Sequence, residues 1–217
     1  MEQFVRPVIA PQEFRNADGR VVPYGERWGM GSPPDDAYSV LTHPERFQPL
    51  HEIARALIAY LERNYDVAVS EDPAHLADLP REMVTATSAT TAVRLTPGNP
   101  NAAPITVTFT PHPGIVIIAG VLYVEPFPAC GCDACDDTWK SESDRLESEV
   151  FAIVAGGLTE QPPTMRHRSF RHRLTRADGW SSGEVNTDGF SPERRASARE
   201  RLKEFGGSWA AWSVREA

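Results

Sequence analysis

The sequence predicts an α+β fold, in which an antiparallel sheet is covered by two to three helices and preceded by an extended arm. Three observations lead to this prediction. Short segments of alternating apolar residues cluster in the middle of the chain, segments with helical apolar spacing flank them, and prolines and glycines concentrate in residues 1–41. With 217 residues, of which 41% are hydrophobic, the chain has enough apolar material for one core.

The N-terminal segment is predicted to be an arm. Its prolines and glycines interrupt any helical or strand period over residues 1–41. It nevertheless carries large apolar side chains, including Phe4, Phe14 and Trp28, which a free linker would not need. We therefore expect residues 1–41 to wrap along a single α+β domain formed by residues 42–217; a lid over a pocket is the functional alternative.

Three helices are predicted from end signals and apolar spacing. Thr42 and Glu45 have capping-box spacing around a proline, and apolar residues then recur at three and four positions to about Asn64. A second helix follows the sequence Asp-Asp-Thr at 136–138 and ends at the glycines at 156–157. A third begins after Ser191 and ends at Gly206–Gly207, and residues 72–76 are expected to form either a short helical turn or a loop.

The sheet is predicted to begin with a three-stranded meander. Residues 91–96 and 105–109 alternate in polarity, and residues 115–124 are apolar on both faces, which is typical of a central strand. C-terminal strands are expected to extend the sheet: a basic one at 164–175 and a short strand or packed tail at 208–214.

All three cysteines lie within six residues, between the third predicted strand and the second predicted helix. Cys130, Cys132 and Cys135 form a C-x-C-x2-C pattern in which Gly131 gives the backbone freedom to turn the thiols together. Closely spaced thiols at a helix start favour thiolates and suit a soft cation. The pattern predicts a structural zinc site in a protein that acts as a binding protein or scaffold.

A fourth zinc ligand is sought among the histidines and nearby aspartates. If residues 115–124 form one strand, His112 lies about 33 Å from the cysteines, at the far end of that strand. A returning basic strand would bring His172 nearer to them than His167. We therefore expect His172 to complete the site, with Asp133, Asp136 and Asp137 as local alternatives, of which Asp136 or Asp137 more readily caps the helix.

The same cysteines also allow an enzyme. Cys132 and Cys135 form a C-x2-C pair at a predicted helix N-terminus, which suits a redox dithiol, and a water molecule in the fourth position would make an open metal site. In either case Arg171 or Arg173 would hold an anionic substrate. The chain lacks G-x-S-x-G, Walker, H-E-x-x-H and G-x-G-x-x-G motifs, so no other catalytic centre is indicated.

A basic segment could bind anions or nucleic acid. The candidates are Arg166, Arg168, Arg171 and Arg173. A net charge of −8 and a single aromatic residue, Phe170, argue against nucleic acid, so pairing with the acidic second helix is favoured. A protein partner or a homo-oligomer is the remaining partner hypothesis. No apolar run approaches membrane-span length and the start lacks secretion-signal features, so a cytoplasmic, soluble protein is expected.

Two motifs are similar to those of a known group of sequences. The segment Pro-Tyr-Gly-Glu-Arg-Trp-Gly at 23–29 and the run Cys-Gly-Cys-Asp-Ala-Cys-Asp at 130–136, together with Pro-Asp-Asp-Ala-Tyr-Ser at 34–39, resemble an uncharacterised actinobacterial family of unknown function. The resemblance spans the arm to the second helix. It implies a bacterial cytoplasmic protein and carries no reaction, cofactor or site residue with it.

Overall fold

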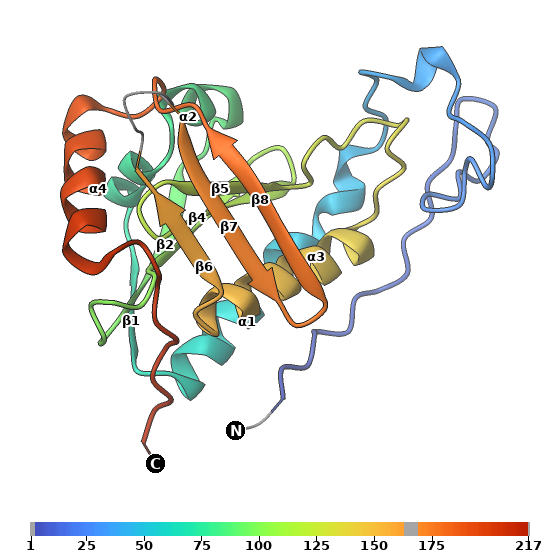
Figure 1. Ribbon diagram of the computed structural model, residues 1–217. Coiled ribbons are helices and arrows are strands. Elements are labelled where there is room, and N and C mark those ends of the chain that lie inside the picture. Colours follow the sequence, from blue (N-terminus) through green and yellow to red (C-terminus); the bar gives the residue numbers. More distant parts are fainter. Residues whose placement is uncertain (1–2, 163–168, 217) are drawn as a thin grey trace.

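The α+β class is confirmed by two antiparallel sheets and the helices around them (Figure 1). The computed structural model describes residues 3–162 and 169–216. The larger sheet has the order β1 (Val67–Glu71), β2 (Thr91–Pro97), β3 (Ile105–Thr110), β4 (Gly114–Ala119), β5 (Tyr123–Phe127). The smaller one has the order β6 (Leu158–Gln161), β7 (Phe170–Arg176), β8 (Gly179–Val185).

Four α-helices accompany the sheets. They are α1 (Pro49–Asn64), α2 (Arg81–Thr87), α3 (Trp139–Val154) and α4 (Pro192–Phe205), with 3₁₀ turns at Asp35–Ala37, Pro44–Phe47 and Pro73–Asp78. The main core joins α1 and α3 to one face of the larger sheet through residues such as Leu57, Ile105 and Val150. Val116 and Ile118 on the opposite face of β4 pack against Leu79, so β4 is buried on both faces. Within the described residues, no helix is both long and apolar enough to cross a bilayer.

The first helix begins later than the capping-box spacing predicts. Residues 44–47 form a 3₁₀ turn and α1 starts at Pro49. The Thr42 hydroxyl is 2.6 Å from Asp133 Oδ2, to which it donates, so it is not used to cap a helix. A tertiary contact has replaced the local one, and this contact ties the arm to the cysteine loop.

The predicted long strand at 115–124 is wrong, because the chain turns back at Gly120. Gly120 has a φ of +58°, and β4 and β5 pair antiparallel on either side of it, with Ile115 opposite Phe127. The turn is held from outside by the buried Glu160 carboxylate. It accepts hydrogen bonds from the backbone N–H groups of Val121, Leu122 and Tyr123 at 2.9–3.1 Å and from the Trp209 indole at 2.6 Å.

This hairpin also overturns the prediction that His112 lies far from the cysteines. Because β5 returns along β4, the loop after Phe127 lies at the end of the sheet where the turn with His112 precedes β4. The ten-residue separation used to place His112 far from the cysteines therefore does not exist. The prediction that His172 lies near the cysteines also assumed one long strand over residues 115–124.

Glu160→Gln should destabilise the protein by roughly 2–3 kcal/mol, because an amide supplies one acceptor and turns its NH₂ toward N–H donors. Urea unfolding monitored by circular dichroism measures the change in the free energy of unfolding. Glu62→Gln, on the exposed side of α1, is the matched control and should shift it by less than about 0.5 kcal/mol. A loss for Glu160→Gln no larger than the control's would show that this carboxylate does not hold the turn.

The C-terminal region contains more strands than the sequence predicts. β7 overlaps the predicted basic segment 164–175, whose residues 164–168 lie outside the described ones, whereas β6 and β8, like β1 in the larger sheet, were not predicted. α4 agrees with its signals, since the Ser191 hydroxyl accepts from Arg194 N–H at 3.2 Å and Gly206 has a φ of +79°. Residues 208–214 form a packed tail that makes only isolated bridges.

The arm contacts the body at two places, near its start and near the cysteine loop, and runs beside the body between them (Figure 1). Phe4 meets the ring of Tyr60 on α1 edge-on at 5.4 Å and that of Phe151 on α3 at 6.2 Å. Arg6 forms ion pairs with two carboxylates of α3, Asp144 and Glu147. The later part of the arm then reaches the loop between β5 and α3, where the cysteines lie.

Candidate metal centre

The three thiols converge in the loop between β5 and α3. The Sγ atoms of Cys130, Cys132 and Cys135 all lie within 4.8 Å of one another, and no other histidine, cysteine or carboxylate among the described residues joins this group. Cys132 is buried, the other two are exposed, and Cys132 Sγ and Cys135 Sγ are 3.4 Å apart. The cysteines are therefore free thiols arranged around one point.

The backbone of the loop is shaped by a glycine and by the arm. Gly131 has a φ of +77°, in the left-handed region that favours glycine, and a Cβ there would lie 3.1 Å from Pro128 Cγ. Asp133 N–H donates to the Val40 carbonyl at 2.7 Å, and Ala134 N–H donates to that of Ala37 at 3.0 Å. These bonds turn the loop so that its cysteine side chains face one another.

Asp133 is the polar anchor between the loop and the arm. Its buried carboxylate accepts from Thr42 N–H at 3.1 Å and from the Thr42 hydroxyl, and lies 3.6 Å from Arg27 Nη1 and 3.8 Å from Arg46 Nη1. Both carboxylate oxygens of Asp133 are thus engaged by the arm, and Asp133 is not part of the group formed by the three sulfurs. This aspartate lies between two of the cysteines in sequence, so it couples the arm directly to the site.

Arg46 packs against the cysteine loop between β5 and α3 and is only 1% exposed. Its guanidinium donates to the carbonyls of Gly131 at 2.7 Å, Asp137 at 3.1 Å and Thr42 at 2.6 Å. It also lies 4.3 Å from the centre of the Tyr24 ring. Burial lowers the pKa of Arg46, while the Asp133 charge acts in the opposite direction, and an arginine remains charged at neutral pH.

The arm motif at 23–29 contacts the cysteine motif directly. The Trp28 indole donates to the Ala134 carbonyl at 3.1 Å, and Arg27 N–H donates to Asp136 Oδ2 at 2.8 Å. Trp28 also packs against the small apolar cluster that contains Ala37 and Cys132. The arm motif at 23–29 and the cysteine motif at 130–136 therefore pack together as one structural unit.

The cluster favours one thiolate. Burial opposes ionisation of Cys132, but hydrogen bonding with Cys130 and with the backbone of Cys135 outweighs it and lowers the pKa to about 7. The side-chain hydrogen bond with Cys132, followed by burial, raises the pKa of Cys135 to about 12. A bound cation would ionise Cys135 as well as Cys132, because a metal deprotonates the thiols that coordinate it.

The sulfur positions fit a tetrahedral ion. With Zn–S bonds of about 2.3 Å, two sulfurs on a tetrahedral zinc are about 3.8 Å apart. The observed separations, 3.4 Å between Cys132 and Cys135 and up to 4.8 Å within the group, lie around that value.

The predicted fourth ligand lies elsewhere in the structure. His172 is on β7, where its ring meets that of Tyr123 edge-on at 4.9 Å and where burial lowers its pKa. It is not part of the group formed by the cysteines, and neither is His112, although the turn of His112 is at the same end of the sheet. Asp136 Oδ2 is used by Arg27, and the helix is capped by Thr138 rather than by Asp136 or Asp137.

The basic segment forms a separate feature. Arg166 and Arg168 lie outside the described residues, whereas Arg171 and Arg173 on β7 line a cavity of about 390 Å³ with Thr159 and Ser182 and without a cysteine. Arg173 lies over the Trp180 ring at 4.3 Å. The basic segment was expected to pair with the acidic residues of α3. Two of these acids instead pair with Arg145, Glu142 at 2.7 Å and Glu149 at 3.8 Å.

Sequence reasoning did not identify the residues that hold the arm. Arg46 was not singled out from the sequence, and Asp133 was considered only as a metal ligand. The available signal for Asp133 was its position inside the cysteine motif of the resembling family, at 130–136. Paired motifs far apart in sequence indicate a contact, but they do not reveal its chemistry.

Fold and site together define an α+β protein with a close three-cysteine cluster that could hold a metal ion. The chain belongs to DUF6226, a family of unknown function, whose model matches residues 10–216. The expected relation to an uncharacterised family is thereby confirmed. No curated protein and no solved structure matches the chain.

Proposed function

We propose that Cys130, Cys132 and Cys135 bind one structural zinc ion that fastens the N-terminal arm to the loop between β5 and α3, in a protein that acts as a binding protein or scaffold. The observation that carries this proposal is the convergence of three sulfurs within 4.8 Å on the same loop that anchors the arm.

The surroundings of the cysteines favour a structural role over a catalytic one. Cys132 is packed among Ala37, Ala134 and Trp28. The neighbouring cavity of about 450 Å³ is lined by Tyr24 and residues around it and by no cysteine, so it does not offer a substrate a route to the sulfurs. A centre that holds two chain segments together contributes directly to folding free energy.

The metal content of the purified protein tests the proposal. Protein prepared under reducing, zinc-replete conditions should contain one zinc per chain by inductively coupled plasma mass spectrometry, and a Co²⁺-substituted sample should show sulfur-to-cobalt charge-transfer absorption. Cys132→Ser should lose the metal. His172→Gln is the control, because it removes an imidazole that could bind metal elsewhere in the fold. We expect this variant to retain zinc because His172 packs against Tyr123.

Two results would overturn this assignment. Wild-type protein without stoichiometric metal would exclude the zinc centre, and loss of zinc in His172→Gln would make that histidine a ligand. A redox dithiol is the second candidate, favoured by the 3.4 Å separation of Cys132 Sγ and Cys135 Sγ. In that case the metal-free protein, treated with oxidised glutathione, would form a Cys132–Cys135 disulfide while one glutathione disulfide is reduced to two glutathione thiols. Alkylation would detect the loss of the two cysteine thiols and their return after reduction.

A further inference from the structure

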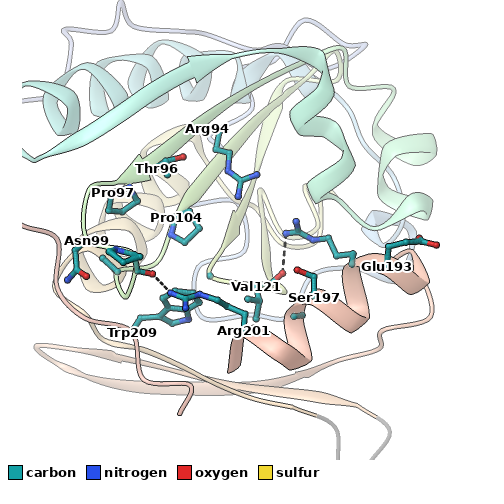
Figure 2. Close-up of a pocket in the computed structure, with 15 residues that line it drawn as sticks. Arg94, Thr96, Pro97, Asn99, Pro104, Val121, Glu193, Ser197, Arg201 and Trp209 are labelled. Carbon is teal, nitrogen blue, oxygen red and sulfur yellow. Dashed lines mark hydrogen bonds between the residues drawn. The ribbon is translucent and has the colours of Figure 1, made fainter. Parts of the chain in front are cut away.

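A second feature of the molecule is a cavity of about 480 Å³ between the larger sheet and α4, at the opposite side of the fold from the arm (Figure 2). Its walls come from β2, from the connection between β2 and β3, from the β4–β5 turn at Gly120, from α4 and from Trp209 in the tail. Its volume lies within the range of about 300–1,000 Å³ that is usual for small-molecule sites.

The walls combine apolar side chains with convergent cationic groups and with four other polar side chains, those of Thr96, Asn99, Glu193 and Ser197. The apolar side chains include Pro97, Pro100, Pro104, Val121, Ala198 and Trp209. The cations are Arg94 from β2 and Arg194 and Arg201 from α4. Figure 2 shows Arg94 and Arg201 entering the same space from the sheet and from the helix.

The cations are incompletely neutralised. Arg94 and Arg194 share one carboxylate, that of Asp78, at 3.2 Å and 2.6 Å. Arg194 Nε is buried and has no hydrogen-bond partner among the described residues, so one donor of its guanidinium is unused. A buried donor without a partner is costly, and the single carboxylate of Asp78 leaves the pair Arg94 and Arg194 with an excess positive charge.

The acidic groups around the cavity are already engaged or lie at its rim. Asp78 accepts from Thr106 at 2.7 Å as well as from the two arginines, and Glu160, behind Gly120, is saturated by its four N–H donors. Glu204 pairs with Arg201 at 3.1 Å. Glu193 on the exposed first turn of α4 is the one carboxylate among the residues that line the cavity.

We propose that this cavity binds a small organic anion, with a carboxylate or phosphate monoester held by Arg94, Arg194 and Arg201 and an apolar body resting against the prolines and Trp209. Guanidinium groups suit both oxyanions because they donate in pairs to planar or tetrahedral acceptors. The site does not involve the cysteine loop, so it stands independently of the zinc centre.

Isothermal titration calorimetry with simple probes tests this assignment on the full-length protein. Phenyl phosphate and benzoate are the anionic probes, benzyl alcohol is the neutral one, and inorganic phosphate lacks the apolar body. We expect saturable one-to-one binding of at least one aromatic anion, and weaker binding of both benzyl alcohol and inorganic phosphate. The preferred anion shows whether the site selects a carboxylate or a phosphate.

Two variants with opposite expected effects separate recognition of charge from damage to the fold. Arg201→Gln should weaken binding of the anionic probe roughly tenfold or more, because one charge-assisted hydrogen bond is lost. Glu193→Gln removes the rim acid and should strengthen binding about two- to fivefold. Arg199→Gln removes the same charge from an exposed position of α4 that does not line the cavity, and it should bind like the wild type.

The proposal is overturned if neither aromatic anion binds saturably, or if benzyl alcohol binds as tightly as the anions. It is also overturned if inorganic phosphate matches phenyl phosphate, since the apolar walls would then have no role. Equal dissociation constants for Glu193→Gln and the wild type, together with an Arg201→Gln effect no larger than that of Arg199→Gln, would show that these charges do not face the ligand.

Discussion

Removal of the metal from the reduced protein should lower its melting temperature by roughly 8–16 °C. A ligand that binds only the folded state at about a thousand times its dissociation constant stabilises that state by about 4 kcal/mol. For a chain of 217 residues each kcal/mol shifts the melting temperature by about 2–4 °C. Differential scanning fluorimetry before and after dialysis against a strong chelator, with a thiol reductant present, measures this shift.

The triple variant Cys130→Ser, Cys132→Ser, Cys135→Ser is the control for this experiment. It should melt near the temperature of the metal-free wild type and should not respond to the chelator. Readdition of one equivalent of zinc should restore the wild type alone. An unchanged wild-type melting temperature after elemental analysis has confirmed complete metal removal would contradict a structural role for the ion.

Much of the fold could be predicted because the relevant signals are local. The apolar spacing along α1 and the Ser-Pro start and Gly-Gly end of α4 are short-range features that act wherever the chain lies. Strands β2 and β3 were found because their alternation of apolar residues and threonines is unambiguous. The cysteine cluster was equally visible because its three thiols lie within one loop.

The errors occurred where distant residues decide the local conformation. Residues 115–124 read as one apolar strand, whereas the turn at Gly120 is stabilised by the Glu160 carboxylate, far along the chain, and by the bond from Gly120 N–H to the Pro104 carbonyl at 3.0 Å. Thr42 has the spacing of a helix cap, yet its hydroxyl is used by Asp133. In both places the local conformation depends on hydrogen bonds to a buried carboxylate that lies far away in the sequence.

The cationic cavity was missed for the same reason. Arg94 lies on a strand, whereas Arg194 and Arg201 lie on a helix about a hundred residues later. The sequence shows a denser run of arginines at 166–176, which attracted the prediction of anion binding. Local density of charge and convergence of charge in space are different quantities, and only the second makes a site.

Arg46→Met should destabilise the protein by roughly 3–5 kcal/mol, the range for removing one partner from a buried ionic network. Methionine fills a similar volume but supplies no donors. The carbonyls of Gly131, Asp137 and Thr42 would lose a hydrogen bond, and the buried Asp133 carboxylate would lose a nearby positive charge. Chemical denaturation measures the loss in unfolding free energy, and hydrogen exchange at residues 36–42 measures release of the arm.

Arg63→Met, at an exposed position of α1, is the matched control and should cost less than about 0.5 kcal/mol. Arg46→Lys should recover little of the lost stability, because a single ammonium group cannot reproduce the fork that reaches three carbonyls. An Arg46→Met effect below 1 kcal/mol, given as a rough threshold, would mean that water replaces the guanidinium at no great cost.

The two largest effects should also depend on each other. Arg46 donates to the carbonyl of Gly131, which lies between two proposed ligands, so loss of the guanidinium should loosen the thiols that hold the metal. A double-mutant cycle between Arg46→Met and Cys132→Ser should therefore give a coupling energy of roughly 0.5–3 kcal/mol. Additive losses would place the arm anchor and the metal centre in separate energetic units, whereas coupling means that the ion stabilises the arm through the loop they share.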